Sequence, residues 1–179
     1  MASDLSELEY LQIERAADFK SEFFGGEMFP MTAQNQTHSL ITANLIGELG
    51  NALKRGPCLV FDGCEPQRFL DSHSDTLLNP TLLIEVLSDS TEAYDRGIKF
   101  EHYRQIPSLR EYLLVSHRDP RLEQFIREPR QEWRYCDVLG FNNTPKLESV
   151  PAAISLTEIF AGVQFEAARR LRTPPSHDA

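Results

Sequence analysis

A short apolar run with an acid inside it, Leu82-Leu-Ile-Glu-Val-Leu87, constrains the fold more than any other stretch of the chain. It is opened by Asn79-Pro80 and closed by Ser88-Asp-Ser90, a pattern typical of a largely buried strand. An ionised carboxylate in such a strand must find a partner or become neutral, because an unpaired charge in an apolar setting is costly. Glu85 therefore indicates either a functional site or a buried ion pair.

A helix is expected directly after this strand. Ser90 or Thr91 can cap its start, and it ends before Pro107 because the residue ahead of a proline disfavours the helical region. Asp95 and Lys99 stand four residues apart on it and so share one face. A strand acid, a helix acid and a helix lysine together form a candidate site.

Periodic segments elsewhere predict an α/β (α+β) domain with a central mixed sheet flanked by helices. Leucine-type residues every fourth position predict a helix over 37–55, and Gly25-Gly26 between apolar arms predicts an N-terminal hairpin. A short helix is expected within residues 3–20. Further strands are expected at 58–61, 109–115, 121–127, 132–138 and 146–150, and helical turns at 154–160 and 165–172.

The length of 179 residues predicts a single domain over 1–172, followed by a disordered tail at 173–179. Apolar runs are all too short for a membrane span, and the first residues lack a basic-then-apolar signal peptide, so a cytoplasmic protein is expected. The net charge of −9 argues against an unaided electrostatic grip on DNA. It does not exclude a nuclease, because a metal-binding site is itself acidic until the cation arrives.

Three residues could converge on one site: Glu27 after the hairpin turn, Glu85 in the strand and Lys99 on the helix. Carboxylates from neighbouring strands suit a hard cation such as Mg²⁺, and a lysine beside them can stabilise charge on a phosphoryl group. Simpler interpretations compete with this one. Glu27 can be a solvated edge charge, Glu85 can pair with Arg96 or Arg104, and Asp95 with Lys99 can be an exposed pair worth roughly 0.3 kcal/mol.

The segment Ile84–Ser88, followed by Ser90–Val115, closely resembles the large bacterial family of putative restriction endonucleases, within the PD-(D/E)XK nuclease superfamily. The resemblance extends to Phe24–Met31 and to Leu156–Phe160. In this family the lysine stands on the following helix rather than two residues after the acid, where this chain has Leu87.

What the resemblance implies is a restriction-endonuclease-like fold and hydrolysis of DNA with Mg²⁺ or Mn²⁺ as cofactor. It implies Glu85 as a metal-binding acid, Lys99 as the catalytic lysine and Glu27 as an accessory acid. Nucleases that cut both strands often pair, so a homodimer is compatible with this function.

The sequence departs from the family at one point, since the Tyr-Pro-Asp-like motif expected before the Glu85 strand is absent. A strand-turn-strand unit is missing between Cys58–Asp62 and Asp75–Pro80. Three explanations are open: Asp62 replaces the usual aspartate as a metal ligand, the protein keeps the fold as a non-catalytic binding or scaffold protein, or the sequence lacks a segment. Asp62 can equally be a turn residue before Gly63.

Overall fold

The computed structural model describes residues 5–19, 21–24, 26–30, 36–61, 79–130 and 132–165. The chain divides into two compact units, residues 1–35 and residues 36–179, and each is described by itself. The tail expected to be disordered lies outside the described residues, and the single domain over 1–172 stays a prediction.

The first unit consists of helix α1 (Glu7–Ala16) and a hairpin of strands β1 (Ser21–Phe24) and β2 (Glu27–Pro30). Ser6 and Glu9 form a capping box that satisfies backbone N–H groups at the start of α1. The two strands pair antiparallel, and Gly26 between them has a φ of 85°, which favours glycine. The predicted helix and hairpin are confirmed.

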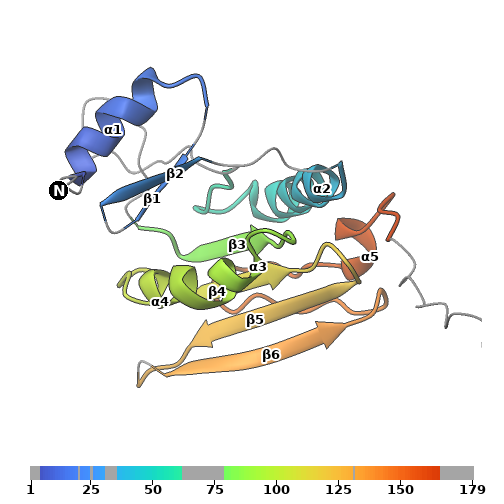
Figure 1. The fold of residues 1–179 in the computed structure, drawn as a ribbon. Coiled ribbons are helices and arrows are strands. Elements are labelled where there is room, and N and C mark those ends of the chain that lie inside the picture. The colour runs from blue at the N-terminus through green and yellow to red at the C-terminus, as the bar shows by residue number, and fades with distance from the viewer. Residues whose placement is uncertain are drawn as a thin grey trace, which may run out of the picture. The chain divides into compact units, whose positions relative to one another are not determined.

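The second unit is built on a four-stranded sheet in the order β3-β4-β5-β6 (Figure 1). Its strands are β3 (Leu82–Val86), β4 (Glu111–Val115), β5 (Arg121–Arg127) and β6 (Trp133–Leu139). β3 and β4 pair parallel, whereas β4 with β5 and β5 with β6 pair antiparallel. The expected mixed sheet is therefore confirmed.

Helices cover both faces of this sheet. Helix α2 (Gln36–Leu53) turns the stripe of Ile41, Leu45, Leu49 and Leu53 toward a core that it shares with α5 (Leu156–Ile159) and one face of β4. On the other face lies one continuous helical segment made of α3 (Glu92–Tyr94), the π-helical turn η1 (Asp95–Lys99) and α4 (Phe100–Tyr103). Within the described ranges no helix is both long and apolar enough to cross a membrane.

Three expected elements differ from the structure. Residues 58–61 are described but form no strand: Cys58 and Val60 pack against the core while Leu59 is 70% exposed, so the alternation is present without a paired ladder. An alternating pattern reports burial on one face, and a strand also requires a neighbour to bond. The strand expected at 146–150 is reduced to an isolated bridge between Lys146 and Ala153. The helix expected over 154–160 is shorter and corresponds to α5. Most of 165–172 lies outside the described residues.

Candidate active site

The predicted acid and lysine meet in the structure. Nζ of Lys99, at the end of η1, lies 3.1 Å from Oε1 of Glu85 on β3 and 3.4 Å from Oδ1 of Asp95 at the start of η1. A buried strand, followed by a helix that packs back on the same sheet face, brings the three side chains together. The lysine is thus held between a strand carboxylate and a helix carboxylate.

Burial distinguishes these three groups from a solvated ion pair. The side chain of Asp95 is 3% exposed and that of Lys99 is 11% exposed, so the interpretation of an exposed i,i+4 pair is wrong. Glu85 is 24% exposed. Buried ion pairs carry a desolvation cost that a surface pair does not, and such arrangements concentrate at functional sites. Of the two carboxylates, that of Glu85 is the more accessible.

Two tyrosines hold the acids in place. The hydroxyl of Tyr103, on α4, donates a hydrogen bond of 3.3 Å to Oε1 of Glu85. The hydroxyl of Tyr112, on β4, donates one of 3.1 Å to the backbone carbonyl of Asp95 and so ties η1 to the sheet. Burial, reinforced by the charge of Glu85, raises the pKa of Tyr112 well above its usual range, so that this hydroxyl remains a donor.

The π-helical turn at Asp95–Lys99 is itself a signal of function. Turns with i→i+5 bonding are rare, and they appear frequently at functional sites. Sequence periodicity predicted the helix but gave no sign of this turn. Tyr103 was open to prediction, since it stands four residues after Lys99 and therefore on the same helical face; Tyr112 was not, because β4 reads as a uniformly buried strand.

The alternative partners considered for Glu85 are engaged elsewhere. Arg96 forms a 3.0 Å ion pair with Glu92 and a further ion pair with Glu123. Arg104 faces Glu101 at 3.8 Å. The structure thus pairs Glu85 with the lysine rather than with either arginine.

The structure does not test the two remaining predicted site residues. Glu27 is the first residue of β2 in the other unit, with an exposed side chain. Asp62 lies outside the described residues. Their parts in the site stay predictions.

Metal binding by these residues can be tested against their donor atoms. Within the described part of the chain, no group of three or more His, Cys, Asp or Glu side chains is placed to hold an ion. Mg²⁺ in nucleotide-processing sites commonly uses only one or two carboxylates and completes its shell with water and phosphate oxygens. The described residues fit such a lean site, with Glu85 as its accessible carboxylate, and do not fit a cage of several protein ligands.

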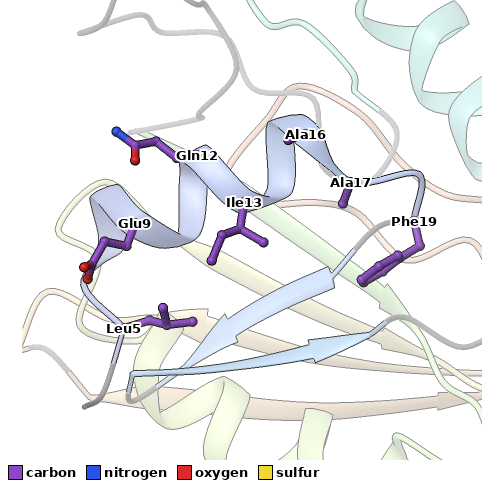
Figure 2. A pocket seen from close by; sticks show the side chains of 7 residues that line it. All are labelled: Leu5, Glu9, Gln12, Ile13, Ala16, Ala17 and Phe19. Atoms are coloured by element: carbon purple, nitrogen blue, oxygen red, sulfur yellow. The ribbon is translucent and has the colours of Figure 1, made fainter. Parts of the chain in front are cut away.

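A separate hollow of about 570 Å³ lies along α1 in the first unit. Figure 2 shows Ile13 and Phe19 turned toward the hairpin while Gln12 points away from it. The lining is mostly apolar, and its acid, Glu9, already caps the helix through Ser6. This hollow therefore offers no group for acid–base or phosphoryl chemistry.

Comparison with known families gives a match over most of the chain. The model of a family described as "Putative restriction endonuclease" matches residues 8–76 and 65–158. The match consists of two segments that overlap at residues 65–76, inside the region where the Tyr-Pro-Asp-like motif was expected.

Similar individual proteins come from cyanobacteria. Two uncharacterised proteins of Synechocystis sp. are 30% and 31% identical; the first match covers 90% of this chain and 94% of that protein, the second 77% and 89%. A solved structure from Anabaena variabilis, described as a putative nuclease belonging to DUF820, has a TM-score of 0.64 at 16% identity. It covers 85% of this chain and 95% of the solved chain, and so shows a shared fold.

Proposed function

Because the chain belongs to the family of putative restriction endonucleases, we propose that it is a metal-dependent endonuclease that hydrolyses DNA phosphodiester bonds. The observation that carries the proposal is the 3.1 Å approach of the Lys99 ammonium to the Glu85 carboxylate, with both groups largely withdrawn from water. A buried lysine beside a partly accessible acid can serve phosphodiester hydrolysis, the acid by holding a metal ion and the lysine by stabilising developing negative charge.

Each side chain has a distinct role in this mechanism. Glu85 would hold Mg²⁺ or Mn²⁺, with Asp62 as a proposed second ligand and Glu27 as an accessory acid. A bound metal of this kind supplies Lewis acidity and a nucleophilic water. Lys99 places a fixed positive charge beside the acid, where it stabilises the negative charge that develops on the phosphoryl oxygens.

Neighbouring side chains hold the Lys99 ammonium and the Glu85 carboxylate in position. Asp95 lies 3.4 Å from Nζ and, being buried, limits the motion of the lysine. Tyr103 donates to Oε1, the oxygen that also faces Lys99, and so fixes the orientation of the Glu85 carboxylate. A preorganised charge costs no rearrangement during the reaction, which is where much of the rate gain of such sites arises.

Plasmid nicking by the purified protein with Mg²⁺ or Mn²⁺ tests the proposal. Glu85→Gln preserves the shape of the side chain but removes its charge, and it should abolish metal-dependent cleavage. Glu101→Gln is the matched control, because that carboxylate stands on α4 with 64% of its side chain exposed. Cleavage that persists in Glu85→Gln would refute the assigned site.

A non-catalytic binding or scaffold role is the second candidate. It is favoured by the lack of a three-carboxylate group in the described ranges. Calorimetric titration with Mg²⁺ or Mn²⁺ separates the two functions, since a site with a single good carboxylate should bind the ion very weakly. A homodimer, proposed because two sites would cut two strands, is checked by light scattering on the same samples.

A further inference from the structure

Two arginines stand directly opposite each other where β4 begins and β5 ends. The register pairs Glu111 with Ile126, so the next pair is Arg110 with Arg127, and the backbone N–H of Arg127 donates to the carbonyl of Arg110 at 2.8 Å. Side chains opposite each other in an antiparallel pair point to the same face, with Cβ atoms about 5 Å apart. Like charges in this arrangement are destabilising.

No carboxylate in the described residues offsets the charge of Arg110. Its side chain is exposed, and no described acid lies within ion-pair distance of it. Arg134, on the neighbouring strand β6, is the opposite case: its guanidinium binds Glu128 at 2.8 Å and Glu148 at 2.7 Å. The fold thus neutralises one arginine internally and leaves the other facing solvent.

Arg127, opposite Arg110, has its guanidinium held by two contacts. Its guanidinium lies 4.9 Å from the centre of the Trp133 ring and donates a hydrogen bond to the backbone carbonyl of Arg104 at the end of α4. Burial, together with the nearby charge of Arg110, holds the pKa of Arg127 below its usual range. Arg110 and Arg127 therefore lie together at one end of the sheet despite their repulsion, and Arg104 meets Arg127 through its backbone carbonyl.

This end of the sheet adjoins the candidate active site. Arg104 directly follows Tyr103, the residue that donates to Glu85, and its side chain is 51% exposed. Glu85 aligns with Leu114, four residues beyond Arg110 along β4 and on the same sheet face, a separation of about 13 Å at 3.3 Å per residue. That distance corresponds to only a few phosphates of a DNA strand.

We propose that Arg110 and Arg104, supported by Arg127, bind backbone phosphates of the DNA substrate and lead the strand to Glu85 and Lys99. The inference rests on the proposed function, because it assigns a grip on the same substrate. It also answers the difficulty posed by a net charge of −9. Phosphates would be met by a local group of arginines in which the exposed Arg110 has no carboxylate partner among the described residues, and the acidic remainder of the surface would not take part.

Fluorescence anisotropy of a labelled DNA duplex, measured without divalent metal across a series of KCl concentrations, tests the cluster. Each phosphate contact contributes about −0.9 to the slope of log K against log salt. Arg110→Ala should therefore weaken binding, irrespective of sequence, and make the slope shallower by about 0.9. Arg134→Ala is the matched control: it removes the same charge from the same end of the sheet, but from an arginine already held by two carboxylates.

The outcomes are distinct. Equal losses in the two variants would show that overall charge governs binding, and an unchanged slope in Arg110→Ala would show that Arg110 makes no contact; either result overturns the proposal. Arg110→Ala should also unfold at the same or a higher temperature, since it relieves repulsion, and a lower temperature would assign Arg110 a structural role instead. Cleavage is measured separately from binding. A wild-type protein that binds DNA through Arg110 but does not cut it would refute the proposed nuclease function and leave the proposed phosphate contact intact.

Discussion

Nζ of Lys99 on a helix lies 3.1 Å from Oε1 of Glu85 on a strand. The acid and the lysine therefore come from two elements, whereas the usual (D/E)XK triplet has both on one strand. The triplet position two residues after the acid is Leu87, which is 2% exposed and packs with Tyr112 and Leu114. A lysine there would have to bury its ammonium in an apolar cluster, at a cost in desolvation. On the helix the ammonium is also largely buried, but there two carboxylates, Glu85 and Asp95, offset its desolvation.

Replacement of Lys99 should separate catalysis from folding only if charge is preserved. Lys99→Ala leaves the buried carboxylate of Asp95 without its cation, which should cost roughly 3 kcal/mol of stability. Lys99→Arg keeps the charge but not the compact ammonium geometry, and should lower the cleavage rate about 100-fold while near-UV circular dichroism stays native. Lys54→Arg, the same substitution at an exposed position just past α2, should have no effect; wild-type activity in Lys99→Arg would contradict the assigned role.

The restraint of Lys99 by Asp95 can be measured without any nuclease assay. The chain has four lysines, so labelling of each amine by a methylating reagent can be followed by mass spectrometry. Wild-type Lys99 should react far more slowly than the exposed Lys54 and Lys146, which serve as references in the same tube. In Asp95→Asn the rate at Lys99 should rise severalfold while the reference rates stay constant.

The control for that measurement is Glu92→Gln. Glu92 forms its own i,i+4 ion pair on the same helical segment, but with Arg96 rather than with the lysine. An increase at Lys99 in this variant as large as in Asp95→Asn would mean that the segment had loosened as a whole. Asp95 would then have no specific positioning role.

Periodic patterns predicted the elements well because they reflect local burial. The leucine stripe of α2 and the glycine turn of the hairpin both appear where expected. Residues 58–61 show the limit: Cys58 and Val60 pack against the core, but the predicted strand does not form, because a strand needs a partner segment elsewhere in the sequence. Pairing is a property of two segments, and periodicity describes one.

The site was predictable to the extent that spacing decides it. The Asp95–Lys99 interval put both on one helix face, the apolar run around Glu85 marked that acid, and the resemblance implied its role as a metal-binding acid. Burial of Asp95 was not predictable, because an i,i+4 pair looks the same in sequence whether it is solvated or enclosed. The same holds for the opposition of Arg110 and Arg127, which depends on the register between two strands.

Alkaline pH should test the buried hydroxyl of Tyr112. At neutral pH Tyr112→Phe should lose about 1 kcal/mol, the value of one hydrogen bond, here to the Asp95 carbonyl. Because burial raises the native pKa, Tyr112 ionises first in the unfolded chain, near the ordinary tyrosine pKa of 10.0. Above that pH, ionisation of Tyr112 stabilises the unfolded state relative to the native state. The free energy of unfolding of the wild type therefore falls by about 1.4 kcal/mol per pH unit, and Tyr112→Phe does not show this loss.

The difference in stability between the two proteins should therefore shrink as pH rises and change sign about one unit above the unfolded pKa. Urea unfolding at a series of pH values measures it. A constant difference across the alkaline range would mean that Tyr112 ionises as readily in the native state as in the unfolded one. Its hydroxyl would then not be held as a buried donor for η1.

Glu111 provides the contrast of a buried acid with a structural task. It alternates along β4 with Leu113 and Val115 and so faces the α2 side of the sheet, away from Glu85. Its Oε2 accepts hydrogen bonds from the backbone N–H of Ser149 at 2.9 Å and of Glu148 at 3.0 Å, which anchors that segment to the sheet. Glu111→Gln replaces an acceptor by a donor aimed at donors, and should cost roughly 3 kcal/mol.

Glu148→Gln is its control, because that side chain is more than half exposed and should change stability by less than about 0.5 kcal/mol. DNA cleavage per folded molecule should be the same in both variants and in the wild type. A fall in cleavage for Glu111→Gln, at a temperature where it is fully folded, would show that this face of the sheet contributes to the reaction. Equal rates would mean that burial and charge alone do not identify a catalytic acid, because Glu111 has both. Glu85 differs from Glu111 in having a lysine beside it and partial access to solvent.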